Sequence, residues 1–128
     1  MRPLRILVVD DEQGIRDLLR DAFAQKGHNV TCAENGVEAI ARVASSRVDA
    51  VFLDVRMPKG DGLTALKEMK TLWPSLPVVM ITGCNQCDFT KEAFRLGTFA
   101  CLIKPFSVRD LVAMLDVLQT QIEDATIN

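Results

Sequence analysis

The sequence predicts an α/β protein in which a five-stranded parallel sheet is covered on both faces by five helices. Short, continuous apolar runs recur along the chain, as expected of strands that are buried on both sides. Between these runs, apolar residues recur every three or four positions, which is the spacing of a helix with one buried face. Regular alternation of the two patterns is typical of strands joined by right-handed crossover helices, and therefore of a doubly wound sheet.

The five predicted strands are the apolar segments at residues 6–9, 30–33, 50–53, 78–81 and 99–103. The predicted helices alternate with them, at residues 13–26, 37–43, 63–72 and 89–96 and from residue 108 onward. Gly27 and Gly97 stand where two of these helices would end, and Pro74 stops a third. Ser107 is placed to cap the last helix.

The composition indicates one globular domain and excludes some classes of function. A chain of 128 residues has room for a single core of ordinary size. The net charge is −2, without a basic stretch, which argues against direct nucleic-acid binding because neutralising phosphates needs clustered Lys and Arg. No apolar run approaches the ~20 residues of a membrane span, and nothing before the first strand resembles a signal peptide. We therefore expect a cytoplasmic protein whose four cysteines are reduced.

Polar side chains follow four of the five predicted strands. These residues are Asp10, Asp11 and Glu12 after the first strand, Asp54 after the third, Thr82 after the fourth and Lys104 after the fifth. Sites in parallel sheets form at the carboxyl ends of the strands, so we expect these side chains to meet in one crevice. Converging carboxylates repel one another unless positive charge lies among them, and a lysine together with Mg²⁺ would supply it. Solvated acidic loop residues are the alternative for one aspartate pair, but they do not explain the whole set.

Several short motifs in the same order resemble the receiver domain of two-component response regulators. They are Asp10-Asp11, Asp54 with Met57-Pro58 and Gly62, Thr82-Gly83, and Lys104-Pro105-Phe106. The resemblance covers about residues 4–120 and implies a flavodoxin-like sheet with strand order 2-1-3-4-5. We expect a receiver domain over residues 1–122 and a polar tail, or the start of a linker, over residues 123–128.

The resemblance also implies a role for each strand-end residue. Asp54 would accept a phosphoryl group from a sensor histidine kinase or a phosphotransfer protein. The carboxylates of Asp11 and Asp54 and the backbone carbonyl of Arg56 would ligate Mg²⁺, for which Mn²⁺ can substitute, while Asp10 would hold the ion through water. The phosphoryl oxygens would be bound by Thr82 and Lys104. A carboxylate is a weak nucleophile, so neutralising charge on the transferring group is what such a site must do.

The implied function is a phosphorylation-dependent switch rather than an enzyme that turns over. Its output would be the face formed by the fourth helix, the fifth strand and the fifth helix, acting on an effector domain or partner outside this chain. Residues 82–106 are similar to receivers that precede transcription-activating ATPase domains, which suggests a transcriptional effector. The sequence leaves open whether the chain forms a homodimer. The resemblance further implies a cis peptide bond between Lys104 and Pro105, a form that only an X-Pro bond adopts at low cost.

Three features depart from the family pattern. Cys101 stands three residues before Lys104, where receivers usually carry Tyr or Phe, and cysteine cannot make the large ring rotation of those residues. Arg56 is placed to point over the phosphoryl group and to change the lifetime of an aspartyl phosphate. Cys84 and Cys87 form a C-x-x-C, but a zinc site needs about four ligands, so we interpret them as incidental small residues unless thiol titration shows redox activity.

Two other functions compete with this interpretation. A degenerate receiver could act only as a protein-interaction scaffold, but all the residues of the acceptor site are present. Phosphatases of the haloacid dehalogenase type also use a strand-end aspartate, but they need a second aspartate two residues later, where this chain has Arg56. His28, between Gly27 and Asn29, is expected in an exposed turn, and Trp73 is expected to cover an edge of the core.

Overall fold

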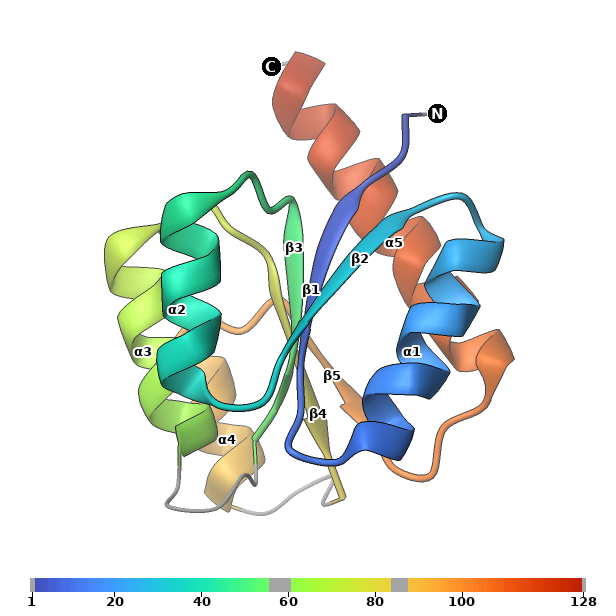
Figure 1. Ribbon diagram of the computed structural model, residues 1–128. Coiled ribbons are helices and arrows are strands. Elements are labelled where there is room, and N and C mark those ends of the chain that lie inside the picture. The colour runs from blue at the N-terminus through green and yellow to red at the C-terminus, as the bar shows by residue number, and fades with distance from the viewer. Residues whose placement is uncertain (1, 56–60, 84–87, 128) are drawn as a thin grey trace.

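The computed structural model describes residues 2–55, 61–83 and 88–127, which form one sheet of five parallel strands (Figure 1). The strands are β1 (Arg5–Val9), β2 (Asn29–Ala33), β3 (Ala50–Asp54), β4 (Val78–Thr82) and β5 (Ala100–Ile103). Their order is β2-β1-β3-β4-β5, and every neighbouring pair is parallel. The predicted fold class and strand order are confirmed.

Five helices connect and follow the strands. They are α1 (Gln13–Gln25), α2 (Gly36–Ser45), α3 (Asp61–Leu72), α4 (Asp88–Arg95) and α5 (Val108–Ile127). Helices α1 and α5 lie on one face of the sheet, and α2, α3 and α4 lie on the other (Figure 1). In the described part of the chain, no helix combines the length and the apolar character that crossing a bilayer requires.

The alternation of side chains along the strands divides the interior into two cores. Leu53 and Met80 point toward α2, α3 and α4, where they meet Leu66 and Met69 of α3. Phe52 points to the other face and stacks at a tilt on Phe23 of α1, with ring centroids 4.8 Å apart. Every residue of β3 and β4 is buried, which explains why these two strands read as continuous apolar runs.

The helix boundaries follow from local signals in the sequence. The hydroxyl of Ser107 accepts a hydrogen bond from the N–H of Asp110 at 3.1 Å, and the Asp110 carboxylate accepts one from the Ser107 N–H at 2.9 Å. This reciprocal pair is a capping box, so the predicted cap of the last helix is confirmed. Gly27 and Gly97 follow α1 and α4 with φ angles of 86° and 100°, a backbone conformation that other residues adopt at a cost.

Helix α5 extends to Ile127 and so includes most of the polar segment predicted as a tail or the start of a linker. The reason is that residues 108–127 contain no Gly or Pro to end the helix, and Ile122 still packs against the core beneath α1 and α5. The division of the chain into a domain over residues 1–122 and a tail stays a prediction.

Two side chains lie elsewhere than the pattern predicts. Leu18 and Leu19 both fit the apolar spacing of the first predicted helix, but α1 turns Leu19 to the core and leaves Leu18 41% exposed. His28 is not an exposed turn residue but is half-buried, and its Nδ1 accepts a hydrogen bond from the N–H of Leu4 at 2.9 Å. Burial lowers the pKa of His28, so the neutral ring that accepts this bond is favoured. Trp73 packs against the edge of a core, as predicted.

Helix α3 begins unusually close to the end of β3. A Cβ atom built on Gly62 would lie within 2.5 Å of the carbonyl oxygen of Asp54, and closer still to that of Val55. Both obstacles are backbone atoms, which cannot move aside as the end of a flexible side chain can. The absence of a side chain at position 62 therefore sets the distance between α3 and the strand end that carries Asp54.

We expect Gly62→Ala to destabilise the protein by about 1–3 kcal/mol, because the added methyl group forces the main chain of α3 away from β3. Gly14→Ala is the matched control, since a Cβ there meets nothing within 4 Å and the position lies inside α1. The control should stabilise the protein by up to about 1 kcal/mol. Urea unfolding of the two variants measures the difference, and equal stabilities would show that the close approach at Gly62 carries no constraint.

Candidate functional site

The strand-end residues predicted from the sequence gather at one edge of the sheet. Asp54 closes β3 and is 3% exposed, and Thr82 closes β4 and is 1% exposed. Asp10 follows β1 and is fully buried. In Figure 1 the carboxyl ends of β1, β3 and β4 lie together, at the opposite end of the molecule from both chain termini. The structure therefore brings these three side chains to the same edge, as a parallel sheet requires.

Lys104 places a positive charge beside the buried aspartate. Its Nζ lies 4.0 Å from Oδ2 of Asp54, which is an ion pair at the limit of direct contact. The lysine follows β5, and its backbone N–H donates to the carbonyl of Thr82 at 2.7 Å, which ties the ends of β4 and β5 together. The bond between Lys104 and Pro105 is cis, as predicted.

Three acidic side chains follow β1 in succession and form a cluster. Carboxylate oxygens of Asp10, Asp11 and Glu12 lie within 4.8 Å of one another. Oδ1 of Asp10 accepts the N–H of Glu12 at 2.9 Å, but Oδ2 of Asp10 is buried and has no hydrogen-bond partner. Within the described residues it is the one buried side-chain oxygen or nitrogen in this condition. A buried polar atom without a partner is costly and requires an explanation.

The surroundings of Asp10 also disfavour the ionised form of its carboxyl group. The pKa of Asp10 is raised from its usual 3.8 to about 6, and burial is the largest cause. The Glu12 N–H and the Lys104 ammonium act against the rise, and the charges of Asp54 and Asp11 contribute to it. One pKa unit corresponds to about 1.4 kcal/mol, so ionising Asp10 costs about 3 kcal/mol more in the folded chain than in water. The positive charges near Asp10 do not offset the cost of burying its carboxylate.

A hard divalent cation fits this arrangement of donors. Mg²⁺ takes one or two carboxylates and completes its shell with water or phosphate oxygens, and Asp11 is exposed to the solvent that would supply the water. The unpartnered Oδ2 of Asp10 and the cluster around it are the features that such an ion would satisfy. The predicted contribution of the Arg56 carbonyl lies outside the described residues, as do Cys84 and Cys87.

One residue of this edge was not predicted from the sequence. Arg16 of α1 turns its guanidinium inward, where Nη1 donates to the backbone carbonyl of Asp10 at 2.7 Å. The side chain is 12% exposed, unlike that of Arg20 one turn later, which is 47% exposed. The only signal in the sequence is an arginine one turn after an acidic cluster, and that signal does not reveal the direction of the side chain.

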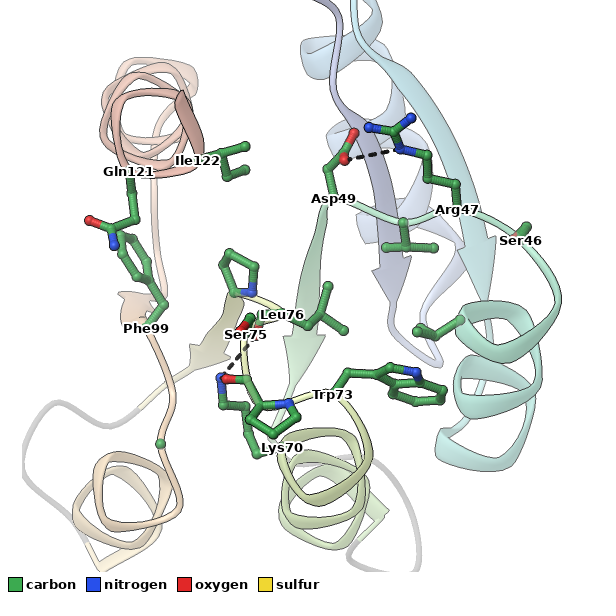
Figure 2. A pocket seen from close by; sticks show the side chains of 15 residues that line it. Ser46, Arg47, Asp49, Lys70, Trp73, Ser75, Leu76, Phe99, Gln121 and Ile122 are labelled. Carbon is green, nitrogen blue, oxygen red and sulfur yellow. Dashed lines mark hydrogen bonds and ion pairs between the residues drawn. The ribbon is translucent and has the colours of Figure 1, made fainter. Parts of the chain in front are cut away.

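A groove lies at the opposite end of the sheet and shares none of these residues. It measures about 770 Å³ and runs between Trp73 on one side and Phe99 and Ile122 on the other (Figure 2). Its cations are engaged within the protein: Lys70 Nζ donates to the carbonyls of Pro74 and Leu76, and Arg47 pairs with Asp49 at 3.8 Å. The chemistry at the carboxyl edge is therefore separate from this groove.

A doubly wound sheet in this order, with an acidic and lysine-flanked edge, defines the flavodoxin-like class of α/β proteins. Comparison with protein families identifies one family within this class. The family model of the response regulator receiver domain matches residues 6–116, and the chain belongs to that family.

Curated relatives and solved structures agree with this assignment. The regulatory protein AtoC of Escherichia coli is 42% identical over 107 residues, which are 84% of this chain and 23% of AtoC. Response regulator MprA of Mycobacterium ulcerans is 36% identical over 94% of this chain and 53% of its own. Chemotaxis protein CheY4 of Vibrio cholerae has a TM-score of 0.86 at 27% identity, covering 91% of this chain and 99% of CheY4. NtrX of Brucella abortus has a TM-score of 0.90 at 32% identity, covering 98% of this chain and 29% of NtrX.

These shares have one further consequence. The chain spans between 23% and 53% of the length of the curated relatives AtoC and MprA, so what those proteins do as a whole extends beyond the region of similarity. The shared part is the receiver domain, a signalling domain of two-component systems that relatives such as AtoC and NtrX carry within longer chains.

We expect Asp10→Asn to stabilise the cation-free protein at pH 7 by about 2–3 kcal/mol, because it removes a buried carboxylate that burial holds at a raised pKa. The raised pKa also fixes the sign of the pH dependence. The folded wild type retains the Asp10 proton up to about pH 6, so its stability falls as the pH rises from 3.8 through 6. Asp10→Asn has no carboxyl group at this position, so its stability does not fall over this pH range for that reason.

Thermal unfolding with a chelator present, at pH 5 and at pH 7.5, measures this effect. The advantage of Asp10→Asn should be large at pH 7.5 and should shrink at pH 5. Asp11→Asn, which changes an exposed carboxylate of the same cluster, serves as the control and should move the melting temperature less. An Asp10→Asn variant no more stable than the wild type at pH 7.5 would contradict the electrostatic account of the site.

Proposed function

We propose that this chain is a phosphorylation-dependent receiver in which Asp54 accepts a phosphoryl group from a histidine kinase or a phosphotransfer protein. The observation that carries the proposal is the position of the Asp54 carboxylate, almost fully buried between the acidic cluster after β1 and the ammonium of Lys104. A carboxylate in that position can attack phosphorus, and charged groups of both signs lie near it to offset the charge of the transferring group.

The reaction forms one bond and breaks one. A carboxylate oxygen of Asp54 attacks phosphorus as the bond between phosphorus and the donor's imidazole nitrogen breaks, which leaves an acyl phosphate on the protein and returns the donor histidine. Lys104 holds one phosphoryl oxygen by charge, and the Thr82 hydroxyl donates to another. The residues that would hold Mg²⁺ are Asp11, Asp54 and, through its backbone carbonyl, Arg56, with Asp10 acting through water. The bound ion would supply positive charge to offset the charge on the transferring group.

Hydrolysis of the acyl phosphate resets the domain. The chain therefore assists its own phosphorylation and dephosphorylation without acting as a turnover enzyme. Arg56 follows Asp54 by two residues, and a guanidinium there would bind phosphoryl oxygens and change the lifetime of the phosphorylated state. We place this reaction in the cytoplasm, with no role for direct nucleic-acid or membrane binding by this domain.

The output surface is the face formed by α4, β5 and α5. Helix α4 is eight residues long, and its buried side chains are the small residues Thr90 and Ala93, whereas Phe89 and Phe94 are 38% and 54% exposed. An element anchored by few buried groups shifts at low cost when charge changes at its amino-terminal end. The shift would alter what this face presents to an effector domain, to a partner protein or to a second copy of the receiver.

Cys101 makes this switch simpler than that of a receiver with an aromatic side chain at the same position. The cysteine is half-buried in β5, beside Met80 of β4 and against the core beneath α3. Its side chain has no ring to turn inward when Thr82 moves toward the phosphoryl group. The signal would therefore pass from Thr82 to α4 directly.

Phosphorylation by a small-molecule donor tests the main proposal. In the presence of Mg²⁺, acetyl phosphate should add a single phosphoryl group to the wild type, measured by intact mass. A chelator should abolish the label because the carboxylates then repel the anionic donor. Asp54→Ala should remove the label, while Asp21→Ala, an exposed aspartate on α1, should leave it unchanged. Labelling that survives in Asp54→Ala would refute the assignment, and a wild type that is never labelled would favour the scaffold function.

Amide chemical shifts test the proposed route of the signal. With beryllium fluoride and Mg²⁺ as a stable stand-in for the phosphoryl group, shifts of residues 83–106 should change in the wild type. Cys101→Ala should respond in the same way, because no ring is involved, whereas Thr82→Ala should respond much less. Identical spectra with and without the phosphoryl mimic would show that α4 and β5 do not switch.

A further inference from the structure

Asp10 is held by contacts from three directions. Its N–H donates to the carbonyl of Ala33 at the end of β2, at 3.2 Å, and its Oδ1 accepts the N–H of Glu12 at 2.9 Å. Its own carbonyl lies just past the last residue of β1, and the partner of that carbonyl is the guanidinium of Arg16 at 2.7 Å. A charge-assisted bond of this length is among the stronger ones in proteins.

Arg16 also reaches the loop after the neighbouring strand. Its Nη2 lies 3.6 Å from Oε1 of Glu34, the residue that follows β2. The Glu34 side chain is 68% exposed, so the pair itself contributes little energy. The pair matters for geometry, because one planar guanidinium contacts both the loop after β1 and the loop after β2. It therefore fixes the position of the loop after β1 relative to the loop after β2.

From these contacts we propose that Arg16 is a positioning residue for the cation site, and that it holds the loop of Asp10, Asp11 and Glu12 in the geometry that binds the ion. The inference rests on the proposed function, since it concerns the same Mg²⁺. Arg16 donates to a backbone carbonyl and so leaves the carboxylate oxygens available to the metal. The conformation of this loop determines where Oδ2 of Asp10 lies, and that oxygen is buried and has no hydrogen-bond partner.

Positioning and simple electrostatics predict opposite changes in Mg²⁺ affinity when Arg16 is removed. A positive charge near a cation site repels the cation, so removing Arg16 would strengthen Mg²⁺ binding if charge were its only effect. Loss of positioning weakens binding instead, and partners that orient metal ligands typically contribute roughly 10–100-fold in affinity. The direction of the change therefore separates the two roles.

The experiment measures Mg²⁺ affinity on the 128-residue chain from the rise in melting temperature with Mg²⁺ concentration, which reports the dissociation constant. Arg16→Met keeps an unbranched stem but removes all donors, and Arg16→Lys keeps the charge but loses the planar fork. Arg20→Met is the matched control, because Arg20 lies one turn further along α1 and is exposed. We expect the dissociation constant to rise roughly 10-fold or more in Arg16→Met, less in Arg16→Lys, and not at all in Arg20→Met.

Equal or tighter Mg²⁺ binding by Arg16→Met overturns the inference, even if that variant melts at a lower temperature without Mg²⁺. Should Arg16→Met fail to fold, Arg16→Lys decides in the same assay: weaker binding supports positioning, and wild-type affinity refutes it. A wild type that gains no stability from Mg²⁺ would overturn the proposed function and this inference together. A wild type that binds Mg²⁺ as its Arg16 variants do would overturn this inference alone.

Discussion

The structure depends on a single electrostatic constraint: two aspartates, Asp10 and Asp54, are almost completely buried at adjacent strand ends, where burial and the charge of Asp54 disfavour the ionised form of Asp10. Burial of like charges in a medium of low dielectric is unfavourable, and one lysine at 4.0 Å offsets only part of it. The fold can hold this arrangement because the parallel sheet fixes both backbones through hydrogen bonds on either side. A looser scaffold would relieve the repulsion by moving the carboxylates apart.

The elements around the site differ in how firmly buried side chains anchor them to the sheet. Strands β3 and β4 are buried along their whole length, and the stacked Phe23 and Phe52 fix α1 to the sheet on one face. Helix α4 stands at the other extreme, short and attached through small side chains. A site built on the rigid strands could keep its geometry while a neighbouring helix shifted, and the proposed switch requires that combination.

Much of the fold and the site could be predicted because both follow from local patterns. The apolar runs of β3 and β4 are unambiguous, and strand topology alone brings Asp10, Asp54 and Thr82 to one edge. Features that depend on the rotation of a helix about its axis could not be predicted. Leu18 and Leu19 are adjacent and equally apolar, so the pattern did not reveal which of them is buried. For the same reason the inward turn of Arg16 had no signature in the sequence. The end of α5 at Ile127 was not predicted, because the polar residues after Glu123 carry no helix-stop signal.

Gly62 has a consequence for the evolution of the chain. Every other amino acid carries a β-carbon, and here that atom would overlap the main-chain oxygens of Asp54 and Val55. No missense change at this codon escapes the overlap, so no single substitution there leaves the surroundings of Asp54 undisturbed. Descendants of this sequence are therefore expected to keep glycine at position 62 as long as α3 stays at its present distance from β3. A descendant that replaces this glycine marks a lineage in which the architecture beside the aspartate has been rebuilt.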